Sequence, residues 1–443
     1  MQNQGIRDAR SLGTPKLLVL GLQHMFAMFG ATVLVPALTG LSVSATLLFA
    51  GLGTLFFHFV TKGKVPAFLG SSFAYLAGYA AIAPNGEAAL LPYACVGVAA
   101  SGLLYLILAA LVRGFGANRV MRFFPPVVTG PIIICIGMTL ANSAINNCTG
   151  SWDIALVAIL TVVIFNIWGK GMLRIIPILL GVLVSYVYAA VTGRVDFSGV
   201  ASAAWIGLPV KMENTVFSLI GNCDANLLVT AIIAIMPIAF ATMIEHIGDI
   251  CAISSTVGAN FIADPGLHRT LLGDGLATSI ASLFGAPANT TYGENTGVLA
   301  LTRVYDPLVI RLAAVYAIIA SFCPKFAALV SARPTGTIGG VSLNLYGMIS
   351  AIGVRNLVEN RVDLAKSRNV IVVSLIISLA LGITFSAAGA ITFHVGEFTL
   401  NFSGLAVAAI VGIVVNAILP GKDYNFQNDY EYGKTTEDHG QML

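Results

Sequence analysis

The sequence predicts an all-α polytopic membrane protein with about 14 transmembrane segments, and three observations support this. The 443-residue chain is 57% hydrophobic and only 10% charged, with a mean hydropathy of +0.88, whereas a soluble domain carries about 25% charged residues. Apolar runs such as 90–112 and 370–388 are long enough to cross a hydrocarbon core about 30 Å thick. Proline and polar residues recur at matching positions in the two halves of the chain, which predicts two inverted seven-segment repeats.

Apolar runs between charged or Gly/Pro-rich breaks define the segments, two of which are short and broken. Residues 1–16 are polar and lack the apolar stretch of a signal peptide. The apolar segment that starts near Leu17 is therefore expected to be a membrane span. The segments are expected to start near Leu17, Ser44, Phe73, Leu90, Val127, Ile154, Ile175, Asn226, Thr270, Glu294, Val309, Thr337, Val370 and Phe402.

The distribution of basic residues provides a check on this count, because Lys and Arg accumulate on the cytoplasmic side of a membrane. If both termini are cytoplasmic, 19 of the 23 basic residues lie inside. The external side then holds only Arg194, Lys211, Lys325 and Arg333. The alternative is that this uneven split results from the choice of segment boundaries.

A fixed offset between landmarks indicates the internal repeat. In each half, a proline precedes a candidate site residue by 7 positions, and the two copies lie about half the chain apart. Because the offset covers seven spans, an odd number, the second half is expected to be inverted relative to the first. The landmark pairs are Pro66 and Pro287, Phe73 and Glu294, Pro15 and Pro237, and Gln23 and Glu245, each 221 or 222 residues apart.

The two broken segments, 66–75 and 287–297, each begin with a proline and contain glycine and small polar residues. Each is expected to form an extended strand followed by a half-helix, whose first N–H groups lack helical partners and offer hydrogen bonds to a ligand. The alternative is a pair of kinked helices. Irregular backbone at membrane depth is tolerated only against protein or a watery cavity, so these segments, with donors near Phe73 and Glu294, predict a binding site.

Three acidic residues in apolar surroundings point to the same site. Glu245 and Asp249 are four residues apart and therefore share a helical face, while Glu294 lies in the second broken segment. An acidic residue within a span costs about 2.5–3.5 kcal/mol, which favours a functional role; His246 is expected to face elsewhere. Carboxylate acceptors beside backbone donors suit a small, uncharged, planar ligand with N–H and C=O groups, such as the pyrimidine uracil.

Other classes of protein are less well supported. The six cysteines lack metal-type spacing, so they are expected to pack as small apolar residues, and no cofactor or metal is expected. An enzyme needs a nucleophile and a base, for which Cys251 near His246 is the one hint. An anion exchanger or channel of similar architecture needs a basic residue near the broken helices, and none occurs in 65–88 or 271–301.

The motifs as a set resemble the nucleobase/ascorbate transporter family, and within it the bacterial uracil permeases. The resemblance spans nearly the whole chain. It is carried by Gln23-His24 with Ala31, Gly70-Ser71-Ser72-Phe73, Glu245-His246-Ile247-Gly248, and the signature from Glu294-Asn295-Thr296-Gly297 to Thr302-Arg303.

The resemblance implies a core domain (14–112 and 226–332), a gate domain (113–225 and 333–421) and a cytoplasmic tail (422–443). It further implies uptake of a nucleobase by proton symport across the cytoplasmic membrane, with the core moving against the gate, and it is compatible with a homodimer.

The resemblance also assigns roles to individual residues. Glu245 and Glu294 are expected to hydrogen-bond the base with the backbone of Phe73 and Gly293, while Ala31, Tyr292 and Tyr346 pack against its ring. Proton coupling or support of the site is expected from Asp249, Gln23, His24 and Asn295.

Two positions bear on the substrate. Uracil permeases can carry a histidine at the position of Asp249. This chain has an aspartate there, like many purine-type relatives, so the resemblance leaves open how protons are handled. Xanthine and urate carriers usually have Gln at the position of Glu294, which favours uracil over xanthine or uric acid as the substrate.

Overall fold

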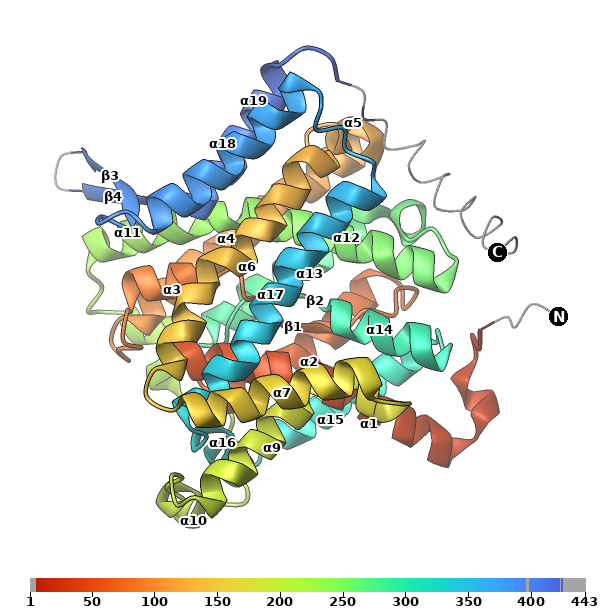
Figure 1. Ribbon diagram of the computed structural model, residues 1–443, viewed down its shortest axis with the longest axis vertical. Coiled ribbons are helices and arrows are strands. Elements are labelled where there is room, and N and C mark those ends of the chain that lie inside the picture. The colour runs from red at the N-terminus through yellow and green to blue at the C-terminus, as the bar shows by residue number, and fades with distance from the viewer. Residues whose placement is uncertain (1–4, 396–397, 423, 425–443) are drawn as a thin grey trace.

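The computed structural model describes residues 5–395, 398–422 and 424, and these are mainly helical (Figure 1). Of the predicted cytoplasmic tail, residues 423 and 425–443 lie outside the described part. The elements of the first half are η1 (Ala9–Leu12), α1 (Thr14–Thr39), α2 (Val43–Val60), β1 (Leu69–Ser71), α3 (Leu76–Ile82), α4 (Leu91–Phe115), α5 (Ala117–Met121), α6 (Pro126–Cys148), α7 (Trp152–Trp168), α8 (Met172–Ile175), α9 (Pro177–Val191), α10 (Ser198–Ser202), η2 (Met212–Asn214) and η3 (Val216–Leu219).

The second half has the same succession of a long helix, a helix, a short strand and a half-helix at its start. Its elements are α11 (Ala225–Ile235), η4 (Met236–Ile238), α12 (Ala239–Val257), η5 (Ile262–Gly266), α13 (Leu267–Leu283), β2 (Asn289–Thr291), α14 (Gly293–Thr302), α15 (Pro307–Ser321), α16 (Pro324–Ser331), α17 (Thr335–Glu359), α18 (Ser367–Thr384), β3 (Ala390–Val395), β4 (Phe398–Ser403) and α19 (Gly404–Ile418).

Helices suited to crossing a membrane account for most of the predicted segments. Within the described residues, seven helical stretches are long and apolar enough to span a bilayer: α1, α2, α4, α6, α11 continued by α12, α17 and α18. The pair α15 and α16, bent by 89°, forms an eighth candidate, and α7, α9 and α19 are shorter apolar helices. With α13 and the half-helices α3 and α14, a helix stands at every predicted segment, which confirms the predicted fold class.

The extended pieces of the two broken segments pair with each other. β1 and β2 run antiparallel, with Gly70 opposite Thr290 at the centre of a three-residue register. Gly70 is required there because a Cβ at this position would stand 2.5 Å from the Tyr292 ring. This pairing gives hydrogen-bond partners to backbone N–H and C=O groups of two segments that lie about half the chain apart. Backbone groups inside a membrane need such partners because no water reaches them there.

A proline in α1 creates a further link to β1. Pro36 has no N–H, so the carbonyl of Thr32 lacks its usual helical donor. The hydroxyl of Ser71 fills this vacancy by donating a hydrogen bond to the Thr32 carbonyl oxygen at 3.0 Å. The hydrogen bond from Ser71 to the free carbonyl of α1 thus holds the end of β1 in place.

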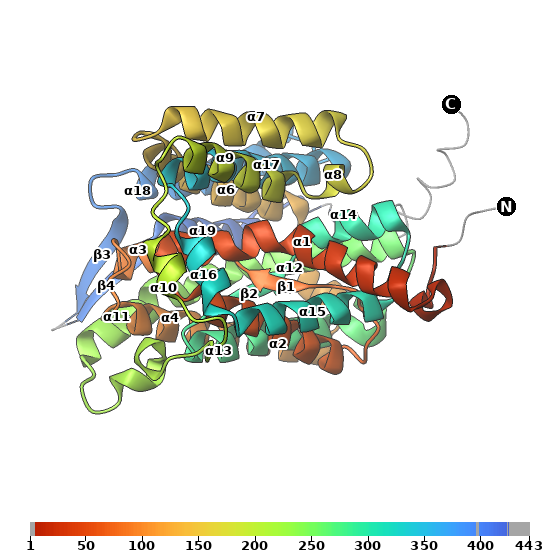
Figure 2. The ribbon, with the colours of Figure 1, turned by 90° about the horizontal axis from the view of Figure 1, so that it is seen from below.

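The helices are arranged in two groups with the strands between them. Figure 2 shows α6, α7, α9 and α17 together on one side and α2, α4, α13 and α15 on the other, with α1 and the β1–β2 pair between them. Helices α18 and α19 lie side by side and pack against α6 (Figure 1). The paired strands therefore lie in the middle of the molecule, with the half-helices α3 and α14 on opposite sides of them (Figures 1 and 2).

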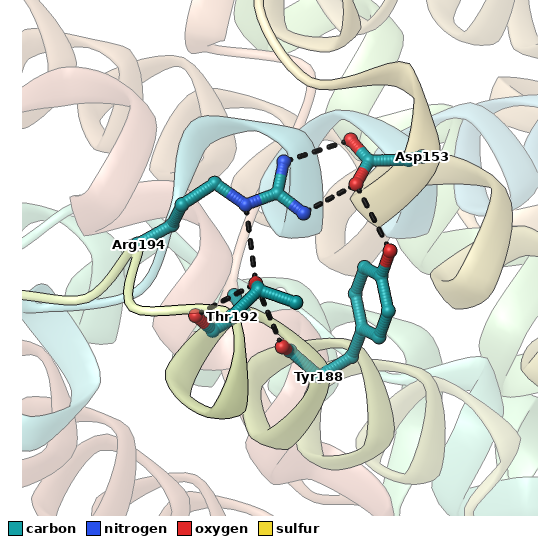
Figure 3. Close-up of polar contacts among 5 residues, drawn as sticks. Asp153, Tyr188, Thr192 and Arg194 are labelled. Atoms are coloured by element: carbon teal, nitrogen blue, oxygen red, sulfur yellow. Dashed lines mark hydrogen bonds and ion pairs between the residues drawn. The ribbon is translucent and has the colours of Figure 1, made fainter.

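Two regions add structure that the sequence did not predict. Strands β3 and β4 form an antiparallel hairpin, so Phe402, where a span was expected to begin, belongs to β4, and α19 starts two residues later. After α9, Arg194 forms a bidentate ion pair with Asp153 at the start of α7, and the Tyr188 hydroxyl donates to Asp153 at 3.1 Å (Figure 3). This cluster ties the end of α9 to α7.

Candidate functional site

The starts of two half-helices leave backbone donors open near the centre of the molecule. Helix α14 begins at Gly293, directly after the extended residue Tyr292, and no side chain caps it. Phe73 follows β1 and precedes α3, whose first turn also lacks a side-chain cap. Because the first N–H groups of a helix have no partner within it, both segments present donors there.

Acidic side chains from α12 and α14 converge beside these donors. Glu245 and Asp249 lie on one face of α12, and the Thr291 hydroxyl at the end of β2 donates to Asp249 Oδ2 at 2.8 Å. Asp249 Oδ1 is 3.8 Å from the point where a Cβ on Gly293 would stand. The carboxyl groups of Glu245 and Glu294 are close enough to repel each other when both are charged. The structure thus brings together the three predicted carboxyl groups.

Open space adjoins the carboxyl groups. Gly248, Gly293 and Gly297 are exposed although their neighbours along the helices are buried or half-buried. A Cβ built on Gly248 or Gly297 would meet nothing within 4 Å. The glycines therefore leave room for a ligand beside Glu245 and Glu294.

Aromatic residues from three elements enclose and support this region. The Phe73 ring lies edge-on to the ring of Tyr346 from α17, with centroids 6.0 Å apart and an interplanar angle of 75°. Tyr292 is buried behind the strands, where its hydroxyl donates to the Ser71 carbonyl at 2.9 Å. Ala31 is also fully buried on α1. Tyr346 comes from α17 of one helix group, and Phe73 comes from the broken segment between the groups, so the site lies at the edge of the α17 group.

The predicted supporting residues divide into two sets. Asn295 and His24 are buried together, and Asn295 Nδ2 donates to the His24 carbonyl at 3.1 Å while lying 3.2 Å from His24 Nδ1. This contact ties α14 to α1. Gln23 instead lines a separate cavity of about 450 Å³ with Lys16 and Thr302, at the far end of α14 from Glu294.

One buried carboxyl group was not singled out from the sequence. Asp274 on α13 is fully buried, and its Oδ2 lies 3.4 Å from Nδ1 of the equally buried His246. The same His246 nitrogen lies 3.4 Å from the Thr291 hydroxyl, which itself binds Asp249. The sequence signal that could have identified Asp274 is an acidic residue within the apolar run 271–284. In the described part of the chain, no three His, Cys, Asp or Glu side chains are grouped so that they could hold a metal ion.

Many buried polar atoms in this region have no hydrogen-bond partner within the described residues. They include Ser72 Oγ, Glu245 Oε2, Thr290 Oγ1 and Asn295 Oδ1. Buried polar groups in native proteins are nearly always paired. Their concentration beside open space is typical of a site that binds a polar ligand or ordered water.

Comparison with known proteins gives consistent matches. The sequence model of the permease family matches residues 15–389. The chain is 42% identical to the uracil permease of Bacillus caldolyticus over 96% of each chain, and 40% identical to that of Bacillus subtilis strain 168 over 99% of this chain and 98% of the relative. The transmembrane domain of the cyanobacterial bicarbonate transporter BicA has the same fold, with a TM-score of 0.59 and 13% identity over 94% of this chain and 100% of that one.

Proposed function

Because the chain belongs to the permease family of nucleobase/ascorbate transporters, and is therefore a multi-pass membrane transporter rather than an enzyme, we propose that it imports uracil by proton symport. The relatives with the highest identities given above are named uracil permeases. The family places the protein in the plasma membrane, and the distribution of basic residues supports cytoplasmic termini.

One observation carries this proposal: two half-helix starts and three carboxyl groups meet beside open space at the edge of the α17 group. The β1–β2 pair fixes the position of both half-helices. Helix α12 supplies Glu245 and Asp249, and α14 supplies Glu294. This arrangement supplies hydrogen-bond donors and acceptors within one small space.

Uracil suits this set of groups because its ring carries two N–H donors and two C=O acceptors. In the proposed complex, Glu245 and Glu294 accept hydrogen bonds from the ring N–H groups. The backbone N–H groups of Phe73 and Gly293 donate to the ring carbonyls. The aromatic pair Phe73–Tyr346 packs against the ring, with Tyr292 and Ala31 behind the strands.

Proton coupling is assigned to the acidic residues of the same region. A carboxyl group in a poorly hydrated site takes up a proton more readily than in water, so a base and a proton can enter together. Glu245, Glu294 and Asp249 are the candidate carriers. Asp249 is connected to Thr291, and Asp274 is linked to the same hydroxyl through His246. One proton moving down 100 mV supplies about 2.3 kcal/mol, enough for roughly 50-fold accumulation of a neutral base.

Alternating access follows from the position of the site at the edge of the α17 group. We assign the group with α2, α4, α13 and α15, together with α1 and α12, to the core domain (14–112 and 226–332). The group with α6, α7, α9 and α17 belongs to the gate domain (113–225 and 333–421). Tyr346 is the gate residue that contacts Phe73 of the core, so movement at this contact opens the site to one side.

The solved neighbour that shares the fold carries an anion, bicarbonate, and the local charge argues against that cargo here. No basic residue occurs in 65–88 or 271–301, whereas carboxyl groups face the open space. Like charges repel, so an anion is poorly accommodated. Xanthine and uric acid, which are larger bases with similar edges, are the competitors for the same site.

Uptake of radiolabelled uracil into proteoliposomes tests the proposal. An inward proton gradient should drive accumulation, unlabelled uracil should compete fully, and xanthine or uric acid should compete weakly. Accumulation driven by a sodium gradient at equal pH would exclude proton symport. Stronger competition by xanthine than by uracil would reassign the substrate.

A further inference from the structure

A second cavity lies at another end of the molecule, where α6 and α18 begin and α19 ends. It has a volume of about 580 Å³, which is in the size range of small-molecule sites. We call it the basic cavity because four cationic side chains and a single carboxylate are among its lining residues. Those residues are Arg122, Arg361, Arg368, Lys422 and Asp363.

Arg368 is held in this cavity by neutral groups. Its Nη1 donates to Asn369 Oδ1 at 3.1 Å, and its Nη2 donates to the carbonyl and the Oδ1 of Asn416 at 3.0 and 2.7 Å. Both asparagines are buried, with 4% and 2% of their surfaces exposed. The amides orient the guanidinium group but leave its positive charge uncompensated.

The same asparagines connect the walls of the cavity. Asn369 Nδ2 donates to the Asp363 carbonyl at 2.9 Å, which holds the loop between α17 and α18. Asn416 Nδ2 approaches the Arg122 carbonyl at 3.5 Å, which brings the segment between α5 and α6 against α19. The network therefore joins the chain segments that carry Arg122 and Arg368, both of which line the cavity.

Three of the four cations in the basic cavity have no carboxylate partner among the described residues. Among the residues that the structure describes, no carboxylate lies within ion-pair distance of Arg122, Arg368 or Lys422. Lys422 donates to the Ala417 carbonyl at 2.6 Å, which is also a neutral acceptor. Three cations around one space attract an anion.

Two long helices add to this potential. α6 starts at Pro126 and α18 at Ser367, neither has a side-chain cap, and Pro126, Val127 and Arg368 line the cavity. The start of a helix carries a partial positive charge and free N–H groups, which together favour phosphate and similar anions. The starts of these two helices and the fixed guanidinium group of Arg368 thus border the same cavity.

We propose that the basic cavity binds a phosphate group, presented by an anionic lipid headgroup or by a soluble phosphate compound. Arginine forks bind phosphate oxygens in pairs, and basic pockets between membrane helices on the cytoplasmic side accept anionic headgroups. All four cations fall on the side that the basic-residue distribution assigns to the cytoplasm. The bound phosphate bridges α6, α18 and α19, and the site is separate from the carboxyl groups of the transport site.

The test uses the purified full-length protein in detergent. Native mass spectrometry counts bound phosphatidylglycerol against phosphatidylcholine, and thermal unfolding measures stabilisation by phosphatidylglycerol, glycerol 3-phosphate and inorganic phosphate. Stabilisation by phosphatidylglycerol alone identifies a lipid site. Stabilisation by the soluble phosphates as well identifies a site open to free anions.

Variants locate the binding. The double variant Arg122→Gln and Lys422→Gln removes two cations whose side chains do not hold the network, and we expect affinity for the phosphate group to fall about fivefold per cation. Arg368→Gln is a second, more severe variant. The matched control is Arg119→Gln with Arg355→Gln, two exposed cations near the same end that do not line the cavity.

The proposal requires the cavity variants to lose phosphate binding while the control retains it. Equal affinity of the wild type and the double variant for every phosphate probe would overturn it, as would equal losses in the double variant and the control. Uracil uptake is not part of this test, so the result stands whether or not the transport proposal holds.

Discussion

The Thr291 hydroxyl donates a hydrogen bond to Asp249 Oδ2 at 2.8 Å, which connects the last residue of β2 to the middle of α12. The same hydroxyl lies 3.4 Å from His246 Nδ1. A residue of the β1–β2 pair therefore touches both a candidate proton carrier and the buried His246–Asp274 pair. Substitutions along this chain of contacts separate binding of the base from its coupling to protons.

Replacing Thr291 with valine tests the first contact. Thr291→Val keeps the shape of the side chain but removes the donor to Asp249, and a hydrogen bond to a charged group is worth about 1.5–3 kcal/mol. We expect proton-driven uracil uptake to fall by about tenfold or more. Thr270→Val is the control, because within the described residues that hydroxyl donates only to the Leu267 carbonyl of its own helix. Uptake equal to the control would exclude a role for the contact.

Glu294→Gln tests the proposed coupling at the site itself. Glutamine keeps the size and one carbonyl acceptor but cannot exchange a proton, so the variant should insert normally and equilibrate uracil. Accumulation should fall from roughly 50-fold at 100 mV to about onefold, as measured with radiolabelled uracil in proteoliposomes. Glu213→Gln, at an exposed position in η2, serves as the control. Undiminished accumulation in Glu294→Gln would remove this carboxyl group from the mechanism.

Asp274→Asn tests the residue that the sequence analysis did not single out. Asparagine preserves the buried volume beside His246 but removes the titratable group. We expect uracil binding, followed by ligand-induced thermal stabilisation, to change less than about threefold, a difference of under 1 kcal/mol. Proton-driven uptake between pH 5.5 and 8 should lose its dependence on pH. Asp264→Asn, which breaks an exposed ion pair with Lys64, controls for loss of an acidic residue; matching pH profiles for wild type and Asp274→Asn would refute the assignment.

Gly70→Ala tests the close approach between β1 and the Tyr292 ring. The added methyl group would stand 2.5 Å from two ring atoms of Tyr292, and overpacking of this kind costs about 1–3 kcal/mol. The thermal unfolding midpoint and the affinity for uracil should both decrease, because β1 positions Phe73. Gly114→Ala has open space around the new methyl group and should match the wild type or exceed it. An unaltered midpoint in Gly70→Ala would show that the strands can separate at no cost.

Local sequence signals predicted much of the fold. Prolines and glycines near Phe73 and Glu294, together with small polar residues, predicted both broken helices, because these residues weaken a continuous helix. The strands that precede the half-helices are confirmed at 69–71 and 289–291. The hairpin β3–β4 was missed because its apolar residues continue those of the neighbouring span, so hydropathy alone did not separate them.

Contacts between helices were harder to predict from the sequence. The 222-residue offset identifies Gln23 and Glu245 as equivalent positions of the two halves, and the structure places Gln23 at the cavity beside Lys16 and Thr302. An offset establishes equivalent positions along two helices and leaves their rotation undetermined. The pairing of His246 with Asp274 likewise depends on how α12 and α13 pack, which their spacing in sequence does not specify.

The antiparallel pairing of β1 with β2 constrains how the protein is made. Ribosomes deliver residues 69–71 about 220 positions before residues 289–291, so the first strand enters the membrane with no partner for its backbone. Unpaired peptide groups are strongly disfavoured in hydrocarbon. Until the second half is made, water or helper proteins would have to form hydrogen bonds with the peptide groups of the first strand. We therefore expect the nascent first half to stay protease-sensitive around Gly70 until the second half has been inserted.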